Sequence, residues 1–275
     1  PMAERVFLKL GGSVITDKET PFTAREDVVR QIAREVVQAM QASPDMRLVI
    51  GHGSGSFGHV VAHRYRTHEG WRDANSWRGF AETAHAAAQL NRLVVGWLLD
   101  EGVPAVSFQP SASALCQRGK LCSMAWEPIE RALDASLIPV VYGDVALDAQ
   151  QSFAIISTEQ LFAYLAQRLH PVRIVLVGMV DGVYERDPLR DPSARRIAWI
   201  TPAQWEAVRS ALGASHAVDV TGGMVSKVQI MVDLVNANPE LQVSIVSGVV
   251  AGRVHDALLG TPSGGTLICA RTPEF

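Results

Sequence analysis

Lysines, glycines and one histidine are grouped in this sequence where an anion could be bound. The segment Lys9-Leu10-Gly11-Gly12-Ser13 ends a short apolar run. Glycines there let backbone N–H groups approach an anion closely, while the lysine supplies a positive charge. The pattern is neither a Walker A loop, which ends in Gly-Lys-Ser or Gly-Lys-Thr, nor GxGxxG. Taken alone, a Gly-Gly pair after a strand more often forms a plain turn.

A second group runs from His52 to His59 with the sequence HGSGSFGH. Small residues leading into a helix make a phosphate cradle, because the first N–H groups are free and the helix dipole is positive there. His59 would lie in the first helical turn, where its ring could donate a hydrogen bond to a phosphate oxygen. The alternatives are a buried, hydrogen-bonded histidine, or a zinc pair with His63 that lacks an evident third ligand.

Three further groups follow. Asp144 ends the segment Tyr-Gly-Asp, where it could orient lysines or a metal or simply form a turn. The stretch 181–188 (DGVYERDP) is consistent with a loop over a nucleotide base or with a surface turn. Residues 221–224 (TGGM) are expected to open a helix with Lys227 one turn in, which would make a second phosphate site with a lysine clamp.

Together these groups favour phosphoryl transfer. Two glycine-rich anion sites are accompanied by Lys9, Lys18 and Lys227. Phosphoryl transfer depends on positive groups and Mg²⁺ around the γ-phosphoryl, with positioning contributing most of the rate.

The elements that would position these groups alternate between strands and helices. Apolar runs predict strands at residues 6–10, 48–50, 105–108, 138–142, 174–177, 243–246 and 266–269. A helix is predicted from Val28 to Met40, with a capping box at Thr23 and Glu26, because apolar residues recur there every fourth position. Further helices are predicted at 57–66, 77–100, 128–135, 158–168, 202–212, 224–236 and 252–258. This order predicts an α/β fold with a mainly parallel sheet covered on both sides, and the turn-rich stretch 185–196 is the best divide between two halves.

Composition narrows the class of partner. The 275 residues are 48% hydrophobic and carry a formal net charge of −3, so no basic field for nucleic acid or anionic membrane is present. No apolar window reaches the roughly 20 residues that span a bilayer. Cys116, Cys122 and Cys269 are odd in number and lack metal spacing, which predicts reduced thiols in a cytoplasmic protein that binds small molecules.

The ordered set KLGGS, HGSGSFGH, YGD, DGVYxxDP and TGGMxxK resembles the amino acid kinase superfamily across nearly the whole chain. Within it, the GSFGH ending and the ITDK segment that contains Lys18 resemble the isopentenyl phosphate kinase family, and fosfomycin kinases are similar. The resemblance implies a three-layer α/β/α sandwich of amino acid kinase type, formed by a single domain over residues 1–275. Its N-terminal half, about 1–170, would bind the acceptor, and its C-terminal half, about 171–275, the nucleotide. It also implies a homodimer that uses ATP and Mg²⁺ to convert isopentenyl phosphate to isopentenyl diphosphate.

The resemblance also implies roles for single residues. Lys9 and Lys18 would flank the transferred phosphoryl, with Lys18 stabilising the transition state and Asp144 orienting the lysines. The acceptor phosphate would be held by Ser54 and His59 under Gly143. The remaining positions would contact ATP, namely Gly11, Gly12, Ser13, Gly55, Asp181, Tyr184, Asp187, Gly222, Gly223 and Lys227.

The sequence departs from the family's pattern in two places. Ser54 stands where the family usually has glycine or alanine, which would tighten the acceptor site. Gly178-Met179 replaces the commoner Thr-Asp before the DGVY segment, so the nucleotide contacts there are open.

The acceptor's phosphate oxygen is already anionic, so the proposed chemistry needs no strong general base and His59 serves as a binder. If His59 is protonated when it binds, affinity should weaken as the pH rises through its pKa. Two other functions remain open: a fosfomycin kinase with a compact phosphonate acceptor, or a non-catalytic nucleotide sensor or storage protein of the same fold. An apolar cavity for a five-carbon tail would favour isopentenyl phosphate. The apolar stripe of helix 77–100 is expected to be ordinary core, and the alternative is that Phe80 or Leu90 on this stripe floors that cavity.

Overall fold

The computed structural model describes residues 4–186, 188, 191–214, 220–261 and 264–272. Its centre is an eight-stranded sheet with the strand order β12-β14-β13-β9-β1-β2-β6-β3. All pairs in this sheet are parallel except β13 with β14, which confirms the mainly parallel sheet. The strands are β1 (Arg5–Leu10), β2 (Arg47–His52), β3 (Ala105–Ser107), β6 (Ile138–Tyr142), β9 (Arg173–Gly178), β12 (Trp199–Ile200), β13 (Gln242–Ser247) and β14 (Thr266–Ile268).

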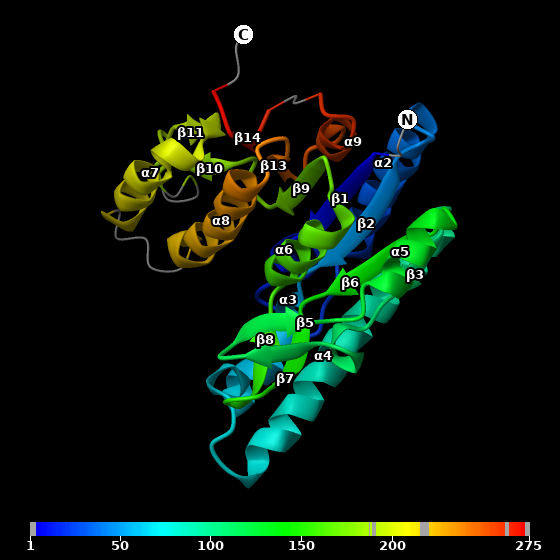
Figure 1. The fold of residues 1–275 in the computed structure, drawn as a ribbon, viewed down its shortest axis with the longest axis vertical. Helices are drawn as coiled ribbons and strands as arrows, with labels where there is room; N and C mark the ends of the chain where they lie inside the picture. The colour runs from blue at the N-terminus through cyan, green and yellow to red at the C-terminus, as the bar shows by residue number, and fades with distance from the viewer. Residues whose placement is uncertain (1–3, 187, 189–190, 215–219, 262–263, 273–275) are drawn as a thin grey trace.

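Helices cover both faces of the sheet, as Figure 1 shows. One side carries α2 (Glu26–Ala42), α3 (Gly55–Tyr65), α4 (Ala74–Asp100) and α9 (Arg253–Leu258). The other side carries α5 (Glu127–Asp134), α6 (Thr158–Leu169), α7 (Pro202–Ala214) and α8 (Val220–Ala237). A single helical turn, α1 (Gly12–Ile15), directly follows β1.

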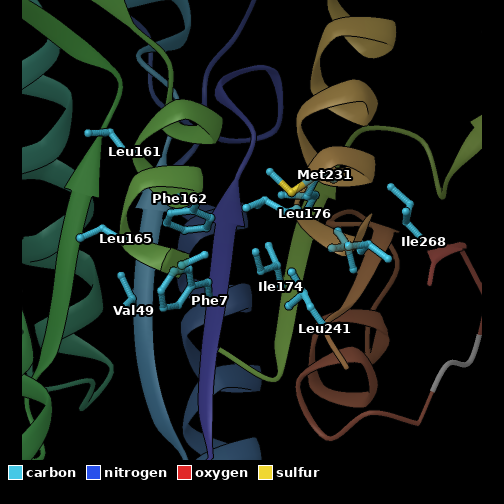
Figure 2. Close-up of a cluster of buried hydrophobic side chains, with 14 of the residues drawn as sticks. Phe7, Val49, Leu161, Phe162, Leu165, Ile174, Leu176, Met231, Leu241 and Ile268 are labelled. Atoms are coloured by element: carbon cyan, nitrogen blue, oxygen red, sulfur yellow. The ribbon is translucent and has the colours of Figure 1, made fainter. Parts of the chain in front are cut away.

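Two hydrophobic cores result, because successive side chains of a strand point to opposite faces. In β1, Val6 and Leu8 belong to the core under α2 and α4, while Phe7 belongs to the core under α6 and α8. Figure 2 shows Phe7 against Phe162 of α6, where the ring centroids are 5.0 Å apart. The three-layer α/β/α architecture is therefore confirmed.

A smaller four-stranded sheet, with the order β5-β4-β7-β8, was not predicted. It consists of β4 (Leu115–Gln117), β5 (Lys120–Ser123), β7 (Asp144–Asp148) and β8 (Ser152–Ile156), and it lies beside α4 in Figure 1. A two-stranded pair, β10 (Val183–Tyr184) with β11 (Arg196–Ile197), spans the turn-rich stretch 185–196. Two short 3₁₀ turns, η1 (Thr67–Glu69) and η2 (Pro110–Ala112), complete the assignment.

The predicted capping box before α2 is wrong. The N-cap of α2 is Arg25, which makes no side-chain cap hydrogen bond, and the hydroxyl of Thr23 donates to the carbonyl of Pro21 instead. The reason is that Arg25 N donates to the carbonyl of Ile15, which fixes the entry into the helix two residues after Thr23. A capping box is present at the start of α4, between Asp73 and Ser76.

None of the helices formed by the described residues is long and apolar enough to cross a membrane.

Candidate active site

The three predicted strand-end segments meet at one edge of the main sheet. Leu10 at the end of β1 pairs with His52 at the end of β2, and His52 pairs with Tyr142 at the end of β6. Because these strands are parallel, the chain leaves all three at the same edge. The segments KLGGS, HGSG and YGD are therefore neighbours, although they lie up to about 130 residues apart in the sequence.

Glycines allow the first two of these segments to pack backbone against backbone. A Cβ atom on Gly12 would lie 2.6 Å from the nitrogen of Gly55, and one on Gly53 would lie 2.8 Å from the nitrogen of Gly12. Gly55 also has a φ of +48°, in the left-handed region that favours glycine. Side chains at these positions would push the segments apart.

The close approach leaves several backbone donors free. Within the described part of the chain, the N–H groups of Gly12, Ser13, Ser54 and Gly55 donate to no acceptor. Ser54 and Gly55 are the N-cap and first residue of α3, so the positive end of its dipole points the same way. These four N–H groups, called the amide cradle below, form a surface suited to phosphate oxygens.

Thr16 links the two halves of the amide cradle and was missed by sequence reasoning. Its hydroxyl donates to the carbonyl of Gly12 at 2.6 Å and accepts from the N–H of Ser56 at 3.0 Å. The side chain is fully buried. A threonine four residues after a glycine pair carries no signal in a sequence, because its second partner lies 40 residues away.

Lys9 and Glu159 form a buried ion pair at the floor of the site. Burial lowers the pKa of Lys9, and the charge of Lys227 lowers it further, while Glu159 raises it. Burial by itself would raise the pKa of Glu159, but the charges of Lys9 and Lys227 hold it below its usual value. Glu159, in the first turn of α6, is thus the group that opposes the fall in the pKa of Lys9.

In the structure the carboxylate paired with Lys9 is that of Glu159, and the role of Asp144 in orienting the lysines stays a prediction. The carboxylate of Asp144 accepts from the N–H of Ser111 at 3.0 Å and from its neighbour Val145 at 2.8 Å. Burial raises the pKa of Asp144. Asp144 therefore anchors η2 beside the site and is engaged by backbone donors, whereas the buried carboxylate on Lys9 comes from α6.

The remaining cations converge on His59. His59 is exposed, but the part of the ring shielded from solvent lowers the pKa of His59, and the charges of Lys227, Lys18 and Lys9 lower it further, in that order. The charges of all three lysines thus affect the pKa of this one ring. His59 is the fifth residue of α3. Among the described residues, no three or more His, Cys, Asp or Glu side chains are grouped so that they could hold a metal ion.

Lys18 is carried by a loop that is tied to α3. The loop is closed by an antiparallel bridge between Thr16 and Ala24, and the N–H of Phe22 donates to the carbonyl of Ser56. The ring of Phe22 packs edge-on against Phe57, with centroids 5.5 Å apart. These contacts hold the loop over the amide cradle while Lys18 remains exposed.

The predicted acceptor residues lie around the same space. The N–H of Gly143 donates to the carbonyl of His52 at 2.9 Å. The hydroxyl of Ser54 occupies room left by Gly58, where a Cβ atom would come within 2.4 Å of it. The serine that departs from the family's pattern is therefore matched by a glycine one turn later.

The predicted nucleotide residues are brought together only in part. The carboxylate of Asp181 accepts from the hydroxyl of Tyr184 at 2.5 Å and pairs with Arg196 at 2.6 Å. Gly222 and Gly223 lie in the first turn of α8, which begins at Val220, and a Cβ atom on Gly223 would have no neighbour within 4 Å. Asp187 lies outside the described residues.

The fold and the strand-end segments match a known class of protein. The model of the amino acid kinase family covers residues 4–247, so the chain belongs to the amino acid kinase family.

Comparison with individual relatives shows to which group within the amino acid kinase family the chain belongs. Isopentenyl phosphate kinase of Methanothermobacter thermautotrophicus is 39% identical, covering 97% of this chain and 99% of its own. The enzyme of Methanocaldococcus jannaschii is 31% identical over 94% of this chain and 96% of its own. A solved isopentenyl phosphate kinase structure is 35% identical, with a TM-score of 0.81 over 96% of this chain and 99% of that one. Within the family, the chain thus belongs with the isopentenyl phosphate kinases. A carbamate kinase from Giardia lamblia, at 14% identity and a TM-score of 0.69, shares the fold alone.

Proposed function

We propose that this chain catalyses the ATP-dependent phosphorylation of isopentenyl phosphate to isopentenyl diphosphate. The observation that carries the proposal is the amide cradle at the ends of β1 and β2, with the buried Lys9–Glu159 ion pair at the end of β1. Such a site is built to hold anions and to neutralise charge during phosphoryl transfer. The relatives at 39% and 31% identity are isopentenyl phosphate kinases, which favours this acceptor over fosfomycin and over a non-catalytic role.

The proposed chemistry is an in-line attack by the acceptor's phosphate oxygen on the γ-phosphorus of ATP. The oxygen is already anionic, so the barrier comes chiefly from repulsion between two anions and not from a proton. His59 and Ser54, the latter with its N–H group in the amide cradle, would hold the acceptor phosphate beneath Gly143. Lys18, on its tethered loop, would stabilise the charge that develops on the transferring group.

On the nucleotide side, we assign the ATP phosphates to Gly11, Gly12, Ser13 and Gly55 and to Lys9 and Lys227. Asp181, Tyr184 and the first turn of α8 with Gly222 and Gly223 would bound the rest of the nucleotide. The N-terminal half, about residues 1–170, would then supply the acceptor site, and the C-terminal half, about 171–275, the nucleotide site. Lys9 belongs to both, because it lies at the end of the central strand β1.

We propose that Mg²⁺ enters bound to the phosphates of ATP. In such sites Mg²⁺ keeps several waters and takes ligands from substrate phosphates. Two buried carboxylates, Asp144 and Glu159, are engaged by backbone donors and by Lys9 respectively, so the phosphates would supply most of the ligands. Bound there, the ion would neutralise part of the charge on the phosphates.

We also propose a cytoplasmic homodimer. Its support is limited to three exposed apolar side chains, Leu93 on α4, Val106 on the edge strand β3 and Leu137 before β6. The free state of Cys116, Cys122 and Cys269 is compatible with a reducing compartment. Sedimentation of the purified protein would test the dimer.

The acceptor is tested by comparing kcat/KM across a panel under saturating Mg-ATP. Isopentenyl phosphate, fosfomycin and a set of amino acids should be assayed with one preparation of the protein. We expect isopentenyl phosphate to give the highest value. A higher value for fosfomycin would replace the proposed acceptor, and turnover of amino acids alone would refute it.

A further inference from the structure

His52, the first histidine of the HGSGSFGH segment, is fully buried at the end of β2 and has no part in the chemistry proposed above. Its Nδ1 atom lies 2.9 Å from the carbonyl oxygen of Gly53, and its Nε2 atom lies 3.1 Å from Nδ2 of Asn91 on α4. An amide nitrogen can only donate, so Nε2 accepts and the ring proton is on Nδ1, where it donates to Gly53.

Contacts with Gly53, Asn91 and Tyr142 hold the ring of His52 in this orientation. The hydroxyl of Ser107, at the end of β3, donates to Oδ1 of Asn91 at 2.5 Å, which turns the amide nitrogen of Asn91 toward the histidine. The imidazole stacks on the ring of Tyr142, with centroids 5.5 Å apart and planes 12° apart. Burial lowers the pKa of His52 to about 4, so the ring is neutral at physiological pH and carries a single proton.

The bond to Gly53 has a consequence across the next peptide. In a planar trans peptide the C=O and N–H groups point in opposite directions. Since the carbonyl of Gly53 faces His52, the N–H of Ser54 faces the other way. Gly143 lies near this nitrogen, since a Cβ atom on Gly143 would stand 3.8 Å from Ser54 N, and no described acceptor takes the Ser54 N–H.

We propose that His52 is a positioning residue for the acceptor phosphate. Through the carbonyl of Gly53 it fixes the direction of the Ser54 N–H, and the series Ser107–Asn91–His52 fixes the proton on Nδ1. The inference rests on the proposed function, because it describes how that same site holds its phosphate. A residue that merely filled space would affect stability without a preference for either ring nitrogen.

Two substitutions separate the two nitrogens. Asparagine places an amide N–H near the position of Nδ1, so His52→Asn can keep the bond to Gly53 and loses the one to Asn91. Glutamine reaches the position of Nε2, so His52→Gln keeps the bond to Asn91 and loses the one to Gly53. Both remove the stacking on Tyr142. Glu35→Ala serves as a control, because Glu35 is buried on α2 and accepts from the N–H groups of Gly252, Val254 and His255, away from the amide cradle.

The experiment measures acceptor KM and kcat with isopentenyl phosphate at saturating Mg-ATP, together with the melting temperature. We expect His52→Gln to raise KM by about 10- to 100-fold, the effect of losing a hydrogen bond to a charged group, with kcat within about 3-fold of wild type. His52→Asn should stay within about 3-fold in KM, and Glu35→Ala should lower the melting temperature alone. The proposal would be overturned if His52→Asn raised the acceptor KM as much as His52→Gln or more. It would also be overturned if the rise in KM correlated with the fall in melting temperature across all three variants.

A second readout does not depend on the variants folding. ¹⁵N NMR of the histidine rings in the wild-type protein should show Nδ1 of His52 protonated and Nε2 bare between pH 6 and 8.5. The opposite tautomer would refute the positioning role. If the wild type failed to phosphorylate isopentenyl phosphate, the proposed function would fall, and the tautomer would still decide whether His52 holds Gly53 as described.

Discussion

Glu159, in the first turn of α6, is ion-paired with Lys9 at the end of β1, and both side chains are buried. The charge of Lys227 acts on both members of the pair, lowering the pKa of Lys9 and that of Glu159. Glu159 opposes the effect of burial and of Lys227 on the pKa of Lys9.

Glu159→Gln should therefore make the activity depend on pH. Without the carboxylate, burial and Lys227 lower the pKa of Lys9 further, so Lys9 loses its proton at a lower pH than in the wild type. We expect kcat to fall by about 10-fold or more at pH 8, since an electrostatic group is lost, and to recover partly as the pH is lowered.

Glu159→Asp, which keeps the charge, is the matched control and should lie nearer to the wild type. The melting temperature belongs beside both measurements, because removing one partner of a buried pair costs about 3–5 kcal/mol. Parallel pH profiles of kcat for Glu159→Gln and the wild type would show that Glu159 does not keep Lys9 charged.

Lys18→Ala should separate catalysis from binding. Lys18 is exposed on a loop held by Phe22 and Phe57, so its removal leaves the fold intact. We expect kcat to fall by about 10²–10³-fold with little change in KM for either substrate, as for loss of one preorganised electrostatic group. A large rise in KM with an unchanged kcat would instead make Lys18 a ground-state binder.

For His59, the substitution and the pH dependence test the same role. His59→Ala should raise the acceptor KM by about 10- to 100-fold, corresponding to the roughly 1.5–3 kcal/mol of a hydrogen bond to a charged group. His59→Gln should be milder, because an amide can still donate. If both variants keep the wild-type KM, the phosphate-binding role is wrong.

The lowered pKa of His59 determines the pH range in which acceptor binding by this residue should change. Partial burial and the three lysines lower its pKa, so the ring is neutral at neutral pH and binds through an N–H donor. The ratio of acceptor KM between His59→Gln and the wild type should be constant from pH 7 to 8.5 and should increase only in acid, where the ring gains a charge. The ratio cancels the titration of the substrate's own phosphate. A decrease across pH 7 to 8.5 would show that His59 binds as a cation there.

Much of the fold was predictable from local pattern. The seven predicted strands all lie within the main sheet, since runs such as Val6–Leu10 are buried on both faces. The small sheet was missed because its strands are three to five residues long and alternate with turns.

In the site, glycine and lysine motifs in the sequence indicated β1, β2 and α8 as the elements that carry functional residues. Glu159 left no such mark, because an acid in the first turn of a helix is ordinary and its partner lies 150 residues away.

Two residues of the apolar stripe of α4, Leu90 and Phe80, lie in different environments. Leu90 is fully buried and lies in the core under α2 with Val94 and Leu98. Phe80 is half-buried and packs against Trp77 and Phe153, with ring centroids 6.0 and 5.3 Å away. Of the two candidates for the floor of a tail cavity, Phe80 therefore remains.

Phe80→Ala should raise kcat/KM for geranyl phosphate relative to isopentenyl phosphate, because each methylene admitted to an apolar pocket is worth about 1–3 kcal/mol. Leu90→Ala is the matched control. It should lose about 2–5 kcal/mol of stability, as core truncations do, and leave the substrate ratio unchanged. An unchanged ratio in Phe80→Ala would place the tail elsewhere, and a changed ratio in Leu90→Ala would return it to the core stripe.

Transfer from one phosphate to another can be observed directly by ³¹P NMR. The purified protein would be incubated with Mg-ATP and isopentenyl phosphate, with Lys18→Ala as the inactive reference. We predict that the single acceptor resonance is replaced by a pair of coupled resonances from a new P–O–P linkage as ATP becomes ADP, and that Lys18→Ala shows this change far more slowly. Conversion of ATP to ADP and inorganic phosphate alone, with the acceptor resonance unchanged, would contradict the proposed transfer.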